Sequence, residues 1–160
     1  MPPNLPWELR LTLRPGSVYY FQHRGLTSVA PHYFIVVNSD PLADQVLLLA
    51  VASSKIETVH QRRRHLPSET LVEITPTEYG ELTLPSIVDC NQVFRRSLAE
   101  LIADWGAGNL KHKADLPPTL LARIQAGIKL SPLVEAEAKS FIKSTTSESK
   151  SGQTPGKFVS

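Results

Sequence analysis

Two continuous apolar runs in the first third of the chain constrain its fold more than any other feature. HYFIVVNS covers 32–39 and QVLLLAVASS covers 45–54. Both have the length of a β-strand, and an unbroken apolar run is typical of a strand that is buried on both faces. The Ser39-Asp40-Pro41 segment that follows the first run has turn chemistry. We therefore predict two buried strands, the second of them central in its sheet.

Three further segments have strand character. SVYYFQ (17–22) follows a turn at Arg14-Pro15-Gly16, LVEIT (71–75) alternates between apolar and polar residues, and SIVDCNQV covers 86–93. The intervening stretch 55–68 is long and polar, and we predict a loop there. Successive strands are not separated by the ~10 or more residues that a parallel crossover helix needs, which argues against a doubly wound sheet.

The hydrophobic period changes at Ser97. Ser97 and Glu100 have the spacing of a capping box, so a helix is predicted to open there. A second helix is predicted from Pro117-Pro118 and a third from Ser131-Pro132. The fold class is therefore mainly β with C-terminal helices, as a small barrel or a strongly bent sheet. Residues 1–143 are expected to form one domain, and the polar stretch 144–160 a disordered tail.

The composition indicates the compartment in which the protein works and limits the kinds of partner that it can have. Cys90 is the single cysteine, so it has no intramolecular disulfide partner, and we expect it to be a buried core residue in a reducing compartment. We find no apolar leader and no window of the ~18 apolar residues that a membrane span needs, so a cytoplasmic protein without membrane contact is expected. The net charge of +2 permits RNA binding without demanding it.

Four segments in order resemble one protein family. RPGSVYYF, HYFIVVNSD, LLLAVASS and LPSIVDCNQV, followed by helices, are similar to the MazF/PemK/Kid toxins of bacterial toxin–antitoxin systems. The corresponding family patterns are P-G-D-I-V, R-P-A-L-V-V-S-N-D, a strand ending in T-S, and V-x-C-D-Q. The match spans residue 15 to about residue 130, and four motifs in the correct order are more specific than any one alone.

The resemblance implies a fold, an activity and partners. The fold is an SH3-like small barrel with flanking helices, of the MazF/Kid/CcdB-like plasmid maintenance toxin type. The activity is a metal-independent endoribonuclease that cleaves single-stranded RNA and needs no cofactor. The expected partners are an antitoxin protein and a second copy of the chain in a homodimer. His32 stands where the family has an Arg, Asn91 where it has an Asp, and Phe94 where an Arg commonly follows.

Metal-free RNA cleavage needs a base, an acid and groups that stabilise charge on the phosphate. His23 lies where some family members carry a functional His, and Arg24 beside it suits a phosphate clamp; a solvated hairpin tip is an equal alternative for both. Ser53 retains a hydroxyl of the family, and hydrogen bonding to the backbone at the strand end is an equal alternative for it. Arg95 could supply the missing cation by a one-residue shift, and a solvated pair with Arg96 ahead of a helix is an equal alternative. The candidate catalytic residues are His23, Arg24, Ser53, Asn91 and Arg95.

A second group of residues is predicted to contact the RNA. Three adjacent arginines neutralise phosphates without reading sequence. The predicted RNA-binding residues are His32, Ser54, Lys55, Arg62, Arg63, Arg64 and Arg96. Tyr33, Tyr79 and Trp105 are candidates for base stacking, although aromatic residues pack in cores more often.

Two other classes of function stay open. A barrel without catalysis would bind RNA or a peptide in the same groove, and Asn91 favours this alternative because an amide cannot act as a base. A structural interaction domain is the third hypothesis. The retained hydroxyls of Ser53 and Ser54 and the basic 62–64 run favour the ribonuclease.

Overall fold

In a computed structural model of the chain, residues 5–22 and 31–143 are described. His23 and Arg24 lie outside the described residues, as does the stretch 144–160 that was predicted to be disordered. The strands are β1 (Val18–Phe21), β2 (His32–Val36), β3 (Val46–Ser53), β4 (Leu71–Ile74), β5 (Ser86–Asp89), β6 (Phe94–Ser97) and β7 (Lys111–Lys113). The helices are α1 (Trp7–Thr12), α2 (Pro41–Asp44), α3 (Ile56–Arg62), the 3-10 helix η1 (Ser68–Thr70), α4 (Leu98–Gly106), α5 (Pro118–Leu130) and α6 (Ala136–Ser140).

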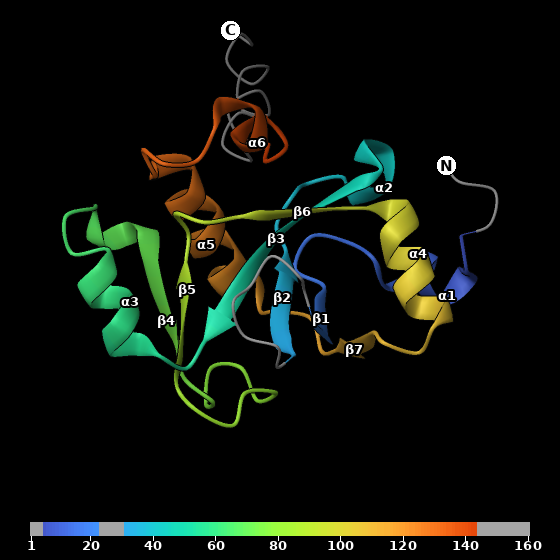
Figure 1. The fold of residues 1–160 in the computed structure, drawn as a ribbon, viewed down its shortest axis with the longest axis horizontal. Coiled ribbons are helices and arrows are strands. Elements are labelled where there is room, and N and C mark those ends of the chain that lie inside the picture. The colour runs from blue at the N-terminus through green and yellow to red at the C-terminus, as the bar shows by residue number, and fades with distance from the viewer. Residues whose placement is uncertain (1–4, 23–30, 144–160) are drawn as a thin grey trace, which may run out of the picture.

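The strands form one antiparallel sheet centred on β3 (Figure 1). The order is β4-β5-β3-β2-β1-β7, and β6 pairs with β3 in addition. One edge of β3 pairs with β2, while the other is divided between β6 at Val46–Leu49 and β5 at Ala52 and Ser53. The prediction that this run is the central strand is confirmed.

The divided edge of β3 bends the sheet. β5 and β6 follow one another in the chain but leave β3 at different points along its length. Among the described residues no ladder joins β4 to β7; instead, Tyr79 donates to the Ala114 carbonyl, and the Ala114 amide donates to Glu81 at 2.8 Å. The prediction of a mainly β fold with C-terminal helices is confirmed, and the bent sheet is consistent with a small barrel.

Apolar side chains cover both faces of the central strands. Along β3, Leu47 and Leu49 join a cluster with residues of α1 and α4, whereas Leu48, Ala50 and Ala52 join a cluster with residues of α5. Alternate residues of a strand point to opposite faces, so burial on both sides requires an apolar residue at every position. This two-sided burial explains the unbroken runs in the sequence.

The predicted core is largely present. Val36, Val37, Leu47, Leu49 and Val88 are fully buried, whereas Val51 is partly exposed because it lines a cleft. The predicted capping box is confirmed: the Glu100 amide donates to Ser97 Oγ at 3.0 Å and the Ser97 amide to Glu100 Oε1 at 2.8 Å.

Several elements differ from prediction. The stretch 55–68 contains α3 rather than loop alone, because Val59 packs into the interior and Ile56 is partly buried, while the remaining α3 side chains are polar. The expected strand 86–93 ends at Asp89, and a turn then leads into β6. The third helix covers only Ala136–Ser140. None of the helices in the described part of the chain is both long and apolar enough to cross a membrane.

Candidate functional site

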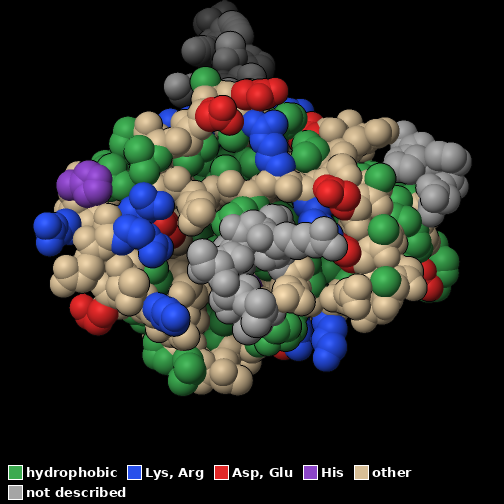
Figure 2. All heavy atoms as spheres, viewed as in Figure 1, with side chains coloured by type: hydrophobic (Ala, Val, Ile, Leu, Met, Phe, Trp, Pro, Cys, Tyr) green, Lys and Arg blue, Asp and Glu red, His purple; other side chains and the backbone are tan. Residues whose placement is uncertain are grey.

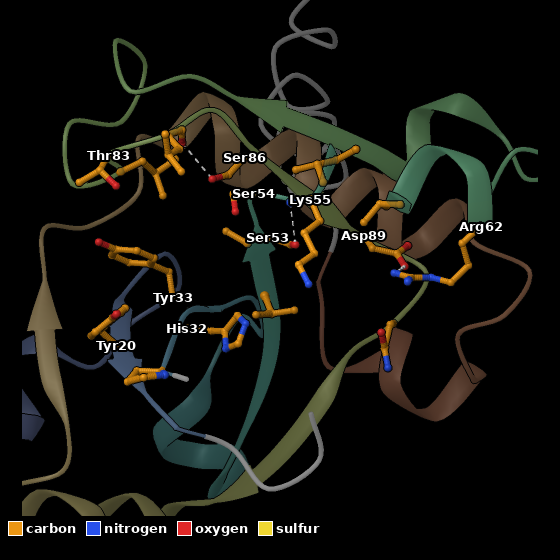
Figure 3. Close-up of a pocket in the computed structure, with 18 of the residues that line it drawn as sticks. Tyr20, His32, Tyr33, Ser53, Ser54, Lys55, Arg62, Thr83, Ser86 and Asp89 are labelled. Carbon is orange, nitrogen blue, oxygen red and sulfur yellow. Dashed lines mark hydrogen bonds and ion pairs between the residues drawn. The ribbon is translucent and has the colours of Figure 1, made fainter. Parts of the chain in front are cut away.

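A cleft of about 600 Å³ opens beside the end of β3, and we call it the first cleft. Figure 3 shows that its walls carry aromatic, hydroxyl and charged side chains that face a common space. Its polar and aromatic lining residues include Tyr20, His32, Tyr33, Ser53, Ser54, Lys55, Arg62, Arg63, Thr83, Ser86, Asp89 and Gln92. Such a concave site with a few convergent polar groups is the usual setting for ligand binding.

All four segments that carry the sequence resemblance contribute to the first cleft. Tyr20 comes from β1, His32 and Tyr33 from β2, Ser53 and Ser54 from the end of β3, and Asp89 from β5. The pairing of β1 with β2, β2 with β3, and β3 with β5 brings these ends together. The structure therefore gathers residues that are up to ~70 positions apart in the chain into one site.

One side of the first cleft is basic. Lys55 precedes α3, and Arg62 and Arg63 lie at its end. Figure 2 shows Lys and Arg side chains gathered over the region of α3, beside the centre of the view. Arg64 is exposed but does not line the cleft. Among the described lining residues, these three cations face the single carboxylate of Asp89, and this excess of positive charge favours an anionic ligand.

Asp89 is a buried carboxylate that is already fully engaged. Its side chain is 7% exposed, and Oδ2 accepts a hydrogen bond from Arg63 Nε at 2.8 Å. The other oxygen, Oδ1, accepts from the backbone amide of Asn91 at 3.1 Å and from its Nδ2 at 3.0 Å. Asp89 therefore fixes the guanidinium of Arg63 at the cleft rather than offering a free base.

Asn91 lies beneath the first cleft and not in its lining. Its side chain also donates to Thr70 Oγ1 at 2.9 Å, and its Oδ1 accepts from Ser131 Oγ at 2.7 Å. Thr70 and Ser131 are fully buried. All polar atoms of the Asn91 amide thus serve a buried network, and the structure assigns it a supporting position instead of contact with a ligand.

His32 and Ser53 both line the first cleft, but they differ in what they offer a ligand. Nδ1 of His32 is buried and has no hydrogen-bond partner within the described parts of the chain, although an imidazole nitrogen normally has one. Ser53 Oγ accepts from the Lys55 amide at 3.1 Å, so its proton remains available for donation. Imidazoles are the usual proton-transfer groups near neutral pH.

Arg95 and Arg96 lie outside the first cleft. Both line a second cleft of about 850 Å³, which shares Tyr20 and Pro31 with the first. Arg95 forms ion pairs with Glu135 at 3.7 Å and Glu137 at 3.3 Å. The structure therefore does not bring Arg95 together with Ser53 around one reacting phosphate.

The aromatic candidates divide between cleft and core. The rings of Tyr20 and Tyr33 lie 4.7 Å apart at the first cleft, and burial raises the pKa of Tyr33, with smaller contributions from Tyr20 and Glu81. Tyr79 is 5% exposed, and its hydroxyl is bound to the Ala114 carbonyl. Trp105 packs against the cluster that includes α4. Of the three predicted stacking residues, only Tyr33 therefore lines a cleft.

Sequence reasoning missed Tyr20 and Asp89. The sequence indicates only a strand position for Tyr20, and the family pattern points to Asn91 rather than to the carboxylate two positions earlier. The sequence did contain a signal for Asp89, because this acidic residue directly follows the apolar pair Ile87 and Val88 in a predicted strand. Its four-residue strand is buried throughout, so its carboxylate required a partner.

The described residues contain no group of three or more His, Cys, Asp or Glu side chains arranged to hold a metal ion. Cys90 is fully buried, as predicted. Burial raises the pKa of its thiol to about 12, and the nearby Asp89 charge adds to this effect. Cys90 is therefore a neutral core residue, not a nucleophile.

Solved structures include chains of similar fold. No protein-family model matches the sequence, and no curated protein matches it. The fold is similar to a solved endoribonuclease in complex with its cognate antitoxin from a mycobacterial species. The match has 12% identity and a TM-score of 0.45, and it covers 83% of this chain and 98% of that one.

Proposed function

We propose that this chain is an endoribonuclease toxin of the MazF/PemK/Kid type that cleaves single-stranded RNA without a metal ion. One observation carries the proposal: the four sequence segments that resemble these toxins all supply side chains to the first cleft. Their ends meet where Lys55, Arg62 and Arg63 provide positive charge. An RNA backbone is an anion that suits this charge, and unpaired bases stack on aromatic rings such as those of Tyr20 and Tyr33.

The proposed reaction is a transesterification. The ribose 2′-oxygen attacks the adjacent phosphorus and loses its proton to a base, while the bond from phosphorus to the 5′-oxygen breaks and that oxygen gains a proton. The products are a 2′,3′-cyclic phosphate and a 5′-hydroxyl. His23 and Arg24 remain our candidates for proton transfer and phosphate clamping, and Ser53 can donate a hydrogen bond to a phosphate oxygen.

His32 is a second candidate for proton transfer. It is the imidazole that lines the described wall of the first cleft, although its Nδ1 is buried. Proton transfer with an RNA hydroxyl therefore requires Nε2, the other ring nitrogen. Lys55 and Arg62 lie on the same cleft and can stabilise the charge that develops on the phosphorane.

The partners follow from the same proposal. A toxin of this type is neutralised by an antitoxin protein, works as a homodimer and acts on RNA in the cytoplasm. Exposed apolar residues are available for such contacts, including Trp7 and Leu11 one turn apart on α1, which are 65% and 62% exposed.

A non-enzymatic module that binds RNA or a peptide is the alternative. It is favoured by Asp89, because both of its oxygens are occupied, and by Asn91, because its amide is buried in a hydrogen-bonded network. The first cleft then keeps its charge and its stacking surfaces but has fewer groups for proton transfer.

A cleavage assay separates the two. The full chain, purified free of any antitoxin, is incubated with a panel of single-stranded RNAs in excess chelator. If the chain is an enzyme, it should cleave the RNA under these conditions. His23→Ala or Arg24→Ala should then change kcat more than KM, because removing a group that acts in the transition state lowers kcat. Salt-sensitive binding of the panel without cleavage of any member would support the binding module instead.

A further inference from the structure

The second cleft adjoins the first, and its chemistry is different. Its walls come from the ends of β1 and β2, from β6, from α4 and from the segment that leads into β7. Three cations are balanced in part by the carboxylates of Glu100 and Asp104, so the net charge is smaller than the lining suggests. A site that mixes charges in this way is poorly suited to bind phosphates by charge alone.

Arg96 is held rigidly in this cleft. The Nε atom of Arg96 lies 2.7 Å from Oδ2 of Asp104, and its Nη2 atom lies 2.5 Å from the same oxygen. The side chains of Arg96 and Asp104 are only 19% and 18% exposed. The guanidinium carbon lies 5.5 Å from the ring centroid of Phe21. The carboxylate thus fixes the edge of the guanidinium, and the aromatic ring supports it from within the protein.

The paired guanidinium of Arg96 offers a ligand a planar surface rather than an unpaired positive charge. Asp104 neutralises it, so Arg96 adds little long-range attraction for a phosphate. Planar guanidinium groups nevertheless stack against unpaired RNA bases, and a group that is already ordered loses little entropy on binding. The rigidity of Arg96 therefore favours stacking.

Groups suited to the rest of a nucleotide surround this surface. Gln22 and Asn109 are exposed carboxamides on the cleft wall, and each offers both donors and an acceptor to the edge of a base. Lys111 is exposed beside them and can meet a phosphate. Tyr20 lines both clefts, so an RNA strand that is bound in the first cleft can continue into the second.

We propose that the second cleft binds an unpaired base of the RNA strand, stacked on the guanidinium of Arg96, next to the cleavage site in the first cleft. This inference rests on the proposed function, because it assigns a part of the same RNA to a second position. It also gives Arg96, which was predicted to bind RNA, the role of a base platform.

The test is binding of the full chain to a fluorescent single-stranded RNA of roughly twelve nucleotides, within the usual site size of single-strand binders. Arg96→Lys keeps the charge but removes the planar group, so affinity should fall roughly ten-fold, the typical effect of one lost stacking contact. Arg14→Lys is the matched control. Arg14 pairs with Asp115 through Nε and NH2, both at 2.7 Å, and lines neither cleft, so this change should leave affinity within about two-fold.

An abasic scan of the RNA identifies the nucleotide whose base contacts the second cleft. Each nucleotide in turn is replaced by a ribose without a base, and both the unmodified chain and Arg96→Lys are titrated. We expect one position at which base removal weakens binding to the unmodified chain but no longer affects the variant. Gln22→Ala changes an exposed side chain on the same cleft wall. Base removal at that same RNA position should also have a smaller effect on the affinity of this variant.

Unchanged affinity in Arg96→Lys, or base effects that are equal in both proteins at every position, would overturn the base pocket. Failure of the unmodified chain to bind the RNA would overturn it as well. If the position-specific coupling is present but no RNA is cut, the base pocket stands and the ribonuclease proposal fails. The two proposals are therefore tested separately.

Discussion

Arg63 and Asp89 form a buried ion pair between the end of α3 and the end of β5, with Arg63 Nε 2.8 Å from Asp89 Oδ2. The two side chains are 17% and 7% exposed. Arg62 approaches the same oxygen at 3.9 Å but is half exposed. The pair therefore attaches α3 to the sheet and sets the position of the basic side of the first cleft.

Removing Asp89 should destabilise the fold strongly. Asp89→Ala leaves the guanidinium of Arg63 without its partner and the Asn91 amide without an acceptor, so the free energy of unfolding should fall by about 3 kcal/mol. Glu73→Ala breaks the exposed pair with His60 and should cost less than about 1 kcal/mol. Urea denaturation measures both, and equal losses would show that the Asp89 pair has no structural role of its own.

Gly127 should not tolerate a methyl group, although it lies within a helix. A Cβ there would lie 2.8 Å from Cys90 Sγ and 2.8 Å from the Glu69 carbonyl oxygen. Gly127→Ala should lower the free energy of unfolding by about 1–3 kcal/mol, as overpacking does. Gly106→Ala in α4 has open space and should be neutral or stabilising by up to about 1 kcal/mol. Thermal unfolding that places both variants above the unmodified chain would contradict the close approach of α5 to Cys90.

Cys90 should be unreactive until the protein unfolds. Burial raises the pKa of its thiol from 9.0 to about 12, so the thiolate is depleted on the order of a thousand-fold at pH 8, and alkylation by iodoacetamide should slow by at least that factor. The raised pKa favours the neutral thiol in the folded state. Its contribution to stability is therefore complete below pH 9 and is lost as the pH rises from 9 to about 12. Mass spectrometry with and without urea follows the alkylation, and rapid labelling of the native protein would contradict this burial.

Arg62 should contribute to RNA affinity through charge. It lines the first cleft and is half exposed, so Arg62→Ala should weaken binding and reduce the slope of log K against log salt by about 1. Arg123→Ala changes an exposed arginine that lines neither cleft and should leave the slope unchanged. Fluorescence anisotropy at several salt concentrations gives both slopes. Identical slopes for the two variants would show that Arg62 does not contact the RNA.

The central strands could be predicted because two-sided burial leaves an unbroken apolar run in the sequence. The short outer elements left no such trace. β7 reads Lys-His-Lys and β6 contains Arg95 and Arg96, so both look like polar linkers and are strands only because β1 and β3 offer them open edges. α3 has the single buried residue Val59, too little for a helical pattern.

The candidate site was predictable where the chain itself places residues together. Ser53, Ser54 and Lys55 are consecutive at the end of β3, and all line the first cleft. Pairing across strands could not be predicted in the same way. The Arg63–Asp89 contact and the separation of Arg96 from the first cleft depend on how β3 divides its edge between β5 and β6.

We propose that the first cleft carries out metal-independent attack by the ribose 2′-oxygen. It is tested most directly by replacing that single hydroxyl by hydrogen at the nucleotide before the cleavage point of an RNA that the full chain cuts in excess chelator. We expect cleavage to stop at that bond, and we expect mass spectrometry of the unmodified RNA to show a 2′,3′-cyclic phosphate and a 5′-hydroxyl. Continued cleavage of the 2′-deoxy RNA at the same bond, or products with a 3′-hydroxyl, would contradict it.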